Sequence, residues 1–254
     1  MFTHLRRGRQ DHQSVHFTPA ACEKWRLGLA VLPLALILTG CAGRNMPPQS
    51  YIGRYHIEEP KADAYRVCSV VNCDENSRLK LSADERQQLH AVFEPAAVDA
   101  VQERKQVAAA VALLERINGA KNNTAGDEAR NHGTFASSPQ LDCIAETINT
   151  TVALLLMQRE GLLHFHHTGY PGHRGPLQLL GPHNTAVMVE NDNGQEYAVD
   201  SWFFANGVEP VVVPLAEWRA GYDPDKDPNR LNAAAAAVEP GPQPVAEPEN
   251  MPAR

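Results

Sequence analysis

The sequence is poor in three things: long apolar runs, positive charge and cysteine. Its N-terminal apolar run, Leu27–Leu38, is shorter than the roughly 20 residues that a membrane-spanning helix needs. It follows Lys24 and Arg26, as the apolar core of a signal peptide follows a basic segment. We therefore expect residues 1–40 to be an export signal and not part of the fold.

The apolar run ends in Leu38-Thr39-Gly40-Cys41, which resembles the bacterial lipobox. In that motif the cysteine is lipidated and becomes the mature N-terminus, so the resemblance implies a lipid anchor on Cys41. An ordinary signal peptide or a membrane anchor is the alternative. Ala42 stands where aspartate would resemble an inner-membrane retention signal, which favours the periplasmic side of the outer membrane.

Positive charge is scarce in the part expected to be exported. Five of the 23 basic residues and two of the 30 acidic residues precede Cys41, so residues 41–254 carry 18 basic and 28 acidic side chains, a net charge of −10. An acidic surface argues against nucleic acid as a partner and against electrostatic adhesion to anionic lipid. Membrane contact should then come from the lipid anchor alone, and the oligomeric state stays open.

Cysteine is also scarce, with only three residues after Cys41. In an oxidising periplasm Cys68 and Cys73 can close a small disulfide loop, which leaves Cys143 unpaired. An unpaired thiol in an exported protein is either a buried, inert side chain or a reactive one. Cys143 alone does not decide between these interpretations.

The 214 residues from Cys41 onward are enough for one domain. Residues 41–64 are polar and carry three prolines, which is typical of a tether. We expect one catalytic domain over residues 65–230. Residues 231–254 have no periodicity and repeated prolines, which predicts a disordered tail.

Two helices are expected before the cysteine. Ser82 and Glu85 have the spacing of a capping box, which predicts a helix to about Phe93. Apolar residues at steps of three and four predict a second, amphipathic helix over residues 96–118, ended by Gly119. A polar surface loop over residues 119–138 should lead to the nucleophile.

A third helix should run from Asp142 to Glu160. Either Asp142 caps it and places Cys143 in its first turn, or it begins at Ser138-Pro139 and places Cys143 one turn inside. The first arrangement suits nucleophilic chemistry better, because a helix N-terminus stabilises a thiolate and lowers its pKa.

Strands are expected around Leu163–His167, over residues 185–190 directly after His183, and over residues 195–200 ending at Asp200. Short edges are expected near residues 177–180 and 210–215. A four-residue hairpin loop over 191–194 would pair Thr185 with Asp200. His183 would then lie diagonally adjacent to Asp200 on the same face of the sheet. A two-residue Asn193-Gly194 turn is the alternative.

Cys143, His183 and Asp200 together have the composition and order of a nucleophilic triad. The cysteine would attack, the histidine would take and return its proton, and the aspartate would fix the imidazole. The Cys143 backbone N–H and the side chain of Gln140 are the candidate oxyanion donors. Trp202 and Phe204 follow Asp200 and would shield the His183–Asp200 contact from water.

The segments LDCIAET, PHNTAVMVE and YAVDSWF resemble the three motifs of the transglutaminase-like superfamily. Separations of forty and seventeen residues between cysteine, histidine and aspartate are similar to those of the bacterial transglutaminase-like cysteine proteinases. The resemblance covers about residues 140–218. It implies an α+β, papain-like or transglutaminase-like fold, with the nucleophile at the N-terminus of a central helix packed on an antiparallel sheet.

The resemblance further implies a cysteine peptidase or amidase acting on a protein or peptide. A transglutaminase or other amine acyltransferase with the same triad, and a structural lipoprotein that retains the fold, remain as alternatives. Some periplasmic members of this group use calcium. Asp142 matches an acidic position, but Ile144 stands where another acidic residue is expected, so no cofactor is expected and calcium is the alternative.

Four histidines between the helix and the last strands suggest a metal at first sight: His164, His166, His167 and His173. A zinc site needs further convergent ligands, and no cysteine pair or HExxH helix lies nearby. We therefore expect no metal and interpret these histidines as solvated loop residues or as part of a substrate cleft. Trp218 is expected in the core or at the domain edge.

Overall fold

A computed structural model describes residues 46–132, 139–175 and 181–230. They form helices and two antiparallel sheets, which confirms the α+β class. The smaller sheet pairs β1 (Tyr65–Cys68) with β2 (Asn76–Leu79). The larger sheet has the order β3-β5-β6-β7, and β4 also pairs with β5. Its strands are β3 (His166–Thr168), β4 (Gly172–Arg174), β5 (His183–Glu190), β6 (Glu196–Asp200) and β7 (Val211–Pro214).

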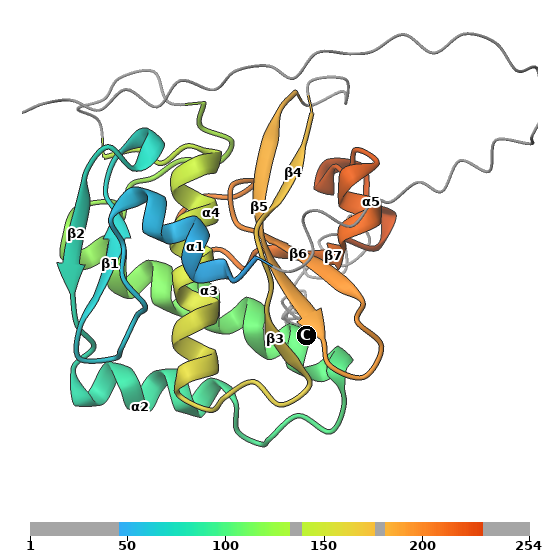
Figure 1. The fold of residues 1–254 in the computed structure, drawn as a ribbon, viewed down its shortest axis with the longest axis horizontal. Helices are drawn as coiled ribbons and strands as arrows, with labels where there is room; N and C mark the ends of the chain where they lie inside the picture. Colours follow the sequence, from blue (N-terminus) through green and yellow to red (C-terminus); the bar gives the residue numbers. More distant parts are fainter. Residues whose placement is uncertain (1–45, 133–138, 176–180, 231–254) are drawn as a thin grey trace, which may run out of the picture. The chain divides into compact units, whose positions relative to one another are not determined.

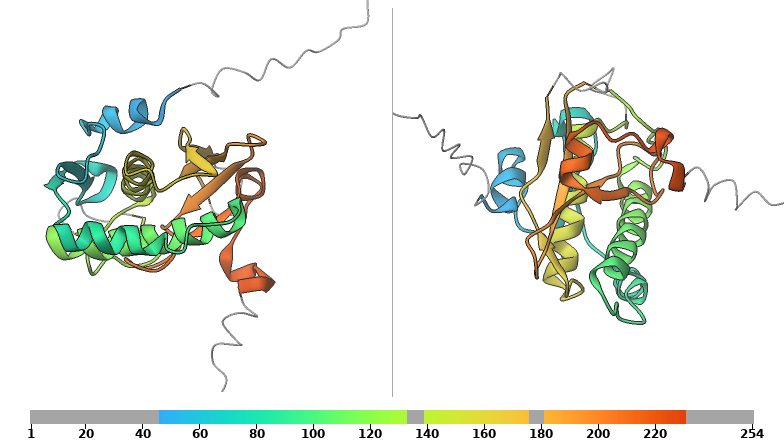
Figure 2. Two further views of the ribbon diagram at one scale, coloured as in Figure 1. Left: turned by 90° about the horizontal axis from the view of Figure 1, so that it is seen from below. Right: turned by 90° about the vertical axis from the view of Figure 1, so that its right-hand side faces the viewer.

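Helix α4 (Cys143–Arg159) is the centre of the fold. It lies between the β1–β2 hairpin and the larger sheet, and α3 (Ala100–Asn122) crosses behind it in the view of Figure 1, as Figure 2 also shows. Twelve of the 17 residues of α4 are buried, and they are distributed over nearly every side of the helix. A helix that is buried all round can hold a side chain at its N-terminus in a fixed position.

The larger sheet confirms the expected register. Ala186 pairs with Val199 and Val189 with Glu196, so the loop between β5 and β6 has four residues. Glu190 donates its backbone N–H to the carbonyl of Gln195 over 2.9 Å, which closes the hairpin. The two-residue turn is therefore excluded.

The segment expected to be a tether is folded from Pro48 onward. It forms α1 (Pro48–Ile52) and the short helix η1 (Gly53–Tyr55), and Ile52 and Ile57 are buried in the main core. Proline at the first position of a helix is compatible with helical geometry, so its presence did not mark an extended chain. The prediction of a tether up to residue 64 is therefore wrong over most of its length, and residues 41–45 lie outside the described ranges.

Helix α2 (Ala83–Val92) begins at the expected capping box: Ser82 accepts from the N–H of Glu85, whose carboxylate accepts from the N–H of Ser82. The expected bounds of the next helix are wrong at both ends. Asp99 caps α3, and the helix continues through Gly119 to Asn122. Gly119 is needed for close packing and not for a stop, since a Cβ there would lie 2.9 Å from the backbone of Ala125.

Residues 168–175, expected to be a loop, contain the short strand β4. Gly172 fits here because a Cβ would lie 2.9 Å from Leu215, at the start of α5 (Leu215–Arg219). The strand expected over 163–167 begins only at His166. The edge expected at 177–180, the tail 231–254 and the export segment lie outside the described residues.

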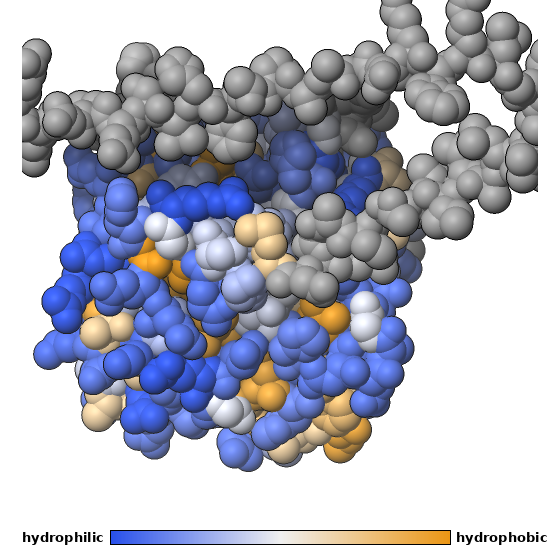
Figure 3. All heavy atoms as spheres, viewed as in Figure 1, coloured by the Kyte–Doolittle hydropathy of each residue, from blue (hydrophilic) through white to orange (hydrophobic). Residues whose placement is uncertain are grey.

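The face drawn in Figure 3 is mainly hydrophilic, with apolar side chains in small separate areas. Large exposed apolar side chains in the described ranges include Val98 and Val101, near the start of α3. Among the helices of these ranges, none combines the length and apolar character needed to cross a bilayer.

Candidate active site

The nucleophile candidate occupies the first position of α4. Asp142 is the N-cap, and its Oδ1 accepts a hydrogen bond of 3.0 Å from the backbone N–H of Ala145. Of the two helix starts considered from the sequence, the one that places Cys143 in the first turn is confirmed. An aspartate cap satisfies a backbone donor that the helix leaves free, which fixes where the helix begins.

The disulfide loop supports this helix end. Cys68 and Cys73 are bonded, which confirms the expected pairing, and among the described residues Cys143 is the free thiol. Inside the loop, the N–H of Asn72 donates to Oδ1 of Asp142 over 3.0 Å. About two turns along α4 from its N-cap, Asn149 exchanges two hydrogen bonds with the backbone of Cys68. The disulfide loop therefore holds the cap of the nucleophile helix from outside.

The histidine and the aspartate are brought together. Nε2 of His183 lies 2.7 Å from Oδ2 of Asp200, and both residues are only 2% exposed. They lie at the adjoining ends of β5 and β6, where the four-residue hairpin loop determines the register. Because Nε2 faces the carboxylate, Nδ1 is the nitrogen left to exchange a proton with another group.

The pair is enclosed by aromatic rings. The ring centroids of Trp202, Trp218 and Phe203 lie 4.4, 5.4 and 5.7 Å from that of His183. Trp202 thus covers the histidine as expected, but Phe203 takes the place predicted for Phe204. The reason is that β6 ends at Asp200, so the alternation of faces along the strand does not continue past it.

Trp218 makes a contact that the sequence did not reveal. Its indole Nε1–H donates to Oδ2 of Asp200 over 2.7 Å, the same oxygen that faces His183. Trp218 is fully buried, as expected for a core residue. It comes from α5, 18 residues after Asp200, and no spacing rule connects the two.

We predict that Trp218→Phe lowers the rate of any His183-dependent reaction by about tenfold, since a hydrogen bond to a charged group contributes roughly 1.5–3 kcal/mol. Phenylalanine keeps an aromatic ring in the core but removes the N–H that steadies Asp200. Steady-state kinetics together with a thermal melt would separate this effect from unfolding. A rate within twofold of wild type would contradict the role.

Cys143 lies in the same side-chain cluster as this aromatic cage. It packs against the group that contains Trp202, Phe203 and Trp218. Burial raises the pKa of its thiol to about 11, and the backbone N–H groups of Asn184 and of Cys143 itself act in the opposite direction. The carboxylates of Asp142 and Asp200 add to the rise. The expectation that the helix N-terminus gives a lowered thiol pKa is therefore wrong for the resting site, because desolvation outweighs the helix end.

The oxyanion role expected for Gln140 is not supported. Its Oε1 accepts from the N–H of Glu128 and the amide of Asn131, and its Nε2 donates to the carbonyl of Gly126. These contacts commit the Gln140 amide to the preceding loop. Of the two donors expected from the sequence, the N–H of Cys143 at the helix start remains as the candidate.

Tyr51 lies on α1, a helix that contacts the nucleophile helix α4, and the sequence did not indicate this. Burial raises the pKa of its phenol, and the charge of Cys143 acts in the same direction. The Tyr51 ring packs in a cluster with those of Tyr55 and Tyr170, at centroid distances of 6.0 and 5.7 Å.

The histidines of the next segment do not form one group. His166 is only 2% exposed, and its Nδ1 lies 2.8 Å from Oε1 of Glu103 on α3. Burial alone would raise the pKa of Glu103, but hydrogen bonds from His166 and from the N–H groups of His164 and Phe165 outweigh it and lower that pKa. His166 therefore joins β3 to α3, which corrects the interpretation as a solvated residue.

The other three histidines of this group are exposed: His164, His167 and His173. In the ranges that the structure covers, no three histidine, cysteine or acidic side chains are arranged to hold a metal ion. Asp142, the acidic position that the family resemblance pairs with calcium, is occupied by its two backbone N–H donors.

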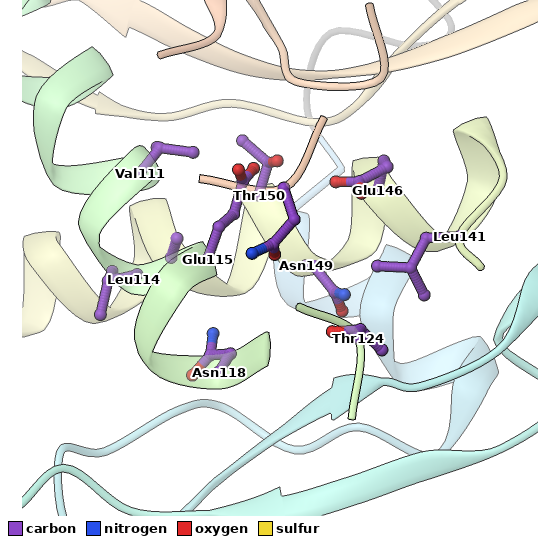
Figure 4. Close-up of a pocket in the computed structure, with 11 residues that line it drawn as sticks. Val111, Leu114, Glu115, Asn118, Thr124, Leu141, Glu146, Asn149 and Thr150 are labelled. Carbon is purple, nitrogen blue, oxygen red and sulfur yellow. The ribbon is translucent and has the colours of Figure 1, made fainter. Parts of the chain in front are cut away.

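A buried acidic cluster lies behind the nucleophile helix. Glu115 from α3 and Glu146 from α4 line a cavity of about 20 Å³, which has the size of about one water molecule (Figure 4). Ser201, the residue after Asp200, donates its hydroxyl to Oε2 of Glu146 over 3.0 Å. Thr150 lies 2.8 Å from the same hydroxyl. The cluster thus connects α4 to the strand end that carries Asp200.

These carboxyl groups should make stability depend on pH. Burial raises the pKa of Glu115 to about 7 from 4.5, and burial followed by the charges of Glu115 and Asp127 raises that of Glu146. A carboxyl group with a raised folded-state pKa contributes stability below its unfolded value, and this contribution is lost as the pH rises through the folded value. The window is therefore about pH 4.5 to 7.

We expect the free energy of unfolding to fall by about 2–3 kcal/mol between pH 5 and pH 8. Urea denaturation of the wild type and of Glu115→Gln at both pH values would measure the change, and the variant should lose most of it. Glu128→Gln, at a solvent-exposed position, is the matched control. A wild-type stability that stays level or rises over this range contradicts the assignment.

Comparisons of the chain with protein-family models, with curated proteins and with solved structures find no match.

Proposed function

We propose that this protein is a cysteine-dependent acyl-transfer enzyme of the papain-like or transglutaminase-like kind, acting as a peptidase or amidase. The observation that carries the proposal is the 2.7 Å contact between His183 and Asp200 inside an aromatic cage that also packs against Cys143. A thiol at a helix N-terminus, a buried imidazole and a carboxylate that orients it are the parts of such a site.

The proposed reaction begins with the thiol protonated. Nδ1 of His183 takes the proton as the sulfur of Cys143 attacks the acyl carbon, and the oxyanion is stabilised by the N–H of Cys143. The imidazolium, steadied by Asp200, then returns the proton to the leaving amine. Water, activated by the same histidine, hydrolyses the thioester. A resting pKa of about 11 favours this general-base route over a preformed thiolate.

The test is the fate of the acyl group. A p-nitrophenyl ester given to the wild type should yield the free acid as the main product, both alone and with an added primary amine. An amide as the main product would identify an amine acyltransferase with the same triad. If Cys143 is never acylated, the protein is a structural lipoprotein that retains the fold.

We further propose that Cys41 carries a lipid anchor on the periplasmic side of the outer membrane. Five residues lie between Cys41 and Pro47, which precedes α1, so the folded part would stay within about 20 Å of its anchor. Because α1 also carries Tyr51, the candidate site would work close to the membrane surface.

We expect Cys41→Ser to move the protein from the membrane fraction to the soluble fraction and to abolish metabolic labelling with palmitate. Cys22→Ser, a change at the other cysteine that precedes the fold, should leave both unchanged. Membrane retention of Cys41→Ser would contradict the anchor without touching the enzymatic proposal.

A further inference from the structure

Arg174 is a buried cation directly behind the candidate site. It is the last residue of β4 and pairs with His183, the first residue of β5. Residues paired in antiparallel strands lie on the same face of a sheet, so Arg174 shares the face that carries His183. Its side chain is only 2% exposed.

The guanidinium is held by the segment that carries Trp218. Its Nη1 donates to the backbone carbonyls of Trp218 and Tyr222 over 3.1 and 3.2 Å. Its central carbon lies 4.6 Å from the centroid of the Trp218 ring, a stacked position in which the cation faces the π-system. Arg174 is therefore fixed beside the residue that donates to Asp200.

The charge of Arg174 is not compensated by contact. Within the described ranges, its Nε and Nη2 have no hydrogen-bond partner and its guanidinium takes part in no ion pair. Asp223, one of the two carboxylates that influence it through space, is already paired with Arg130 and Lys226. Burying an unpaired charge costs several kcal/mol, so its retention calls for an explanation.

The groups that interact electrostatically with Arg174 explain why a buried, unpaired charge is retained at this position. Burial lowers the pKa of Arg174, and Asp200, Asp223 and Cys143 oppose that shift through space. Asp200 and Cys143 belong to the candidate triad, where negative charge is needed on the carboxylate at rest and on the sulfur during attack. A fixed buried cation stabilises both, because Coulomb interactions are strong where water is excluded.

We propose that Arg174 is a positioning residue whose buried positive charge stabilises the Cys143 sulfur as it ionises. This role rests on the proposed function, because the Arg174 charge would stabilise the sulfur in the same acyl-transfer reaction. Arg174 touches neither the thiol nor the imidazole in a hydrogen bond, so it acts through the field at the sulfur and through Trp218.

The test is the rate at which iodoacetamide alkylates Cys143 between pH 7 and pH 9, in the wild type and two variants. Arg174→Gln keeps an amide that can bond the carbonyls but removes the charge, and should react about fivefold more slowly at each pH. Arg174→Lys keeps the charge and should react within twofold of the wild type. Arg130→Gln is the matched control, since Arg130 lies 5.3 Å from the Phe203 ring but on the surface side of the cluster.

Two results would overturn the proposal: an Arg174→Gln rate equal to that of the wild type, or an Arg174→Lys rate as low as that of Arg174→Gln. A thermal melt of each variant checks that it folds. If Arg174→Gln does not fold, the alkylation rate of Arg174→Lys decides: a rate within twofold of the wild type supports the proposal, and a slower rate overturns it. Alkylation of Cys143 by iodoacetamide does not require the protein to be an active enzyme, so it tests the role of Arg174 independently of the proposed reaction. Failure of the proposed function would instead appear as absent acylation of Cys143 by the ester, so the two failures are distinguishable.

Discussion

His183→Gln is expected to slow the acylation of Cys143 by about 10³–10⁴-fold. Because burial raises the pKa of the thiol to about 11, very little of the sulfur is ionised at neutral pH unless a base removes its proton. Glutamine occupies a similar volume but is not a base. Release of p-nitrophenol from an activated ester in a single turnover measures the step directly.

The matched control is His167→Gln. His167 is exposed on β3, where its Nδ1 lies 2.7 Å from Oδ1 of Asn191. Its loss should leave the rate unchanged. If His183→Gln retains a tenth or more of the wild-type rate, His183 is not the general base and the buried thiol reacts by another route.

Asp200→Asn should lower turnover by a similar factor, about 10³–10⁴-fold. The carboxylate accepts from the Trp218 indole and faces Nε2 of His183 with one oxygen. Asparagine keeps the size of the side chain but cannot balance an imidazolium, and its amide can hold the ring in the wrong tautomer. The pH dependence of turnover, with a melting curve of the same sample, would measure the effect.

Asp192→Asn is the control, since Asp192 lies exposed in the loop of the same hairpin. It should be indistinguishable from the wild type in both assays. Should Asp200→Asn lose stability but keep its turnover, Asp200 would be a structural partner of Trp218 and not part of a triad.

The parts of the site that the sequence predicts are those determined locally. Asp142 before an apolar helix identifies the start of α4 and therefore the place of Cys143. Alternating strands and a polar four-residue loop set the β5–β6 register, which brings His183 to Asp200. Each inference needs only neighbouring residues and a fixed period.

The parts that the sequence did not predict depend on contacts between distant segments. Trp218 and Arg174 meet across 44 positions of the chain, and Glu103 and His166 across 63. No helical or strand period predicts a contact at either of these sequence separations. The sequence alone also does not distinguish a buried charged residue from a solvated one. The prediction that Gly119 ends the helix failed for a related reason, because only the packing against Ala125 shows why glycine is needed inside α3.

Desolvation explains the remaining error. A helix N-terminus lowers the pKa of a thiol that is exposed to it, and on that ground Cys143 was expected to be ionised. The aromatic cage and the surrounding core instead bury the sulfur, and burial favours the neutral form more than the helix end favours the anion. How deeply a residue at a helix start is buried depends on elements that the local sequence does not place.

Whether His183 activates Cys143 for acylation can be measured by mass spectrometry of the Cys143 peptide after rapid quenching of a reaction with p-nitrophenyl acetate. We expect one acetyl group on that peptide in the wild type, removable by hydroxylamine, and none in His183→Gln over the same time. An unmodified Cys143 in a protein that still releases acetate, or an acetyl group on another residue, would contradict this expectation.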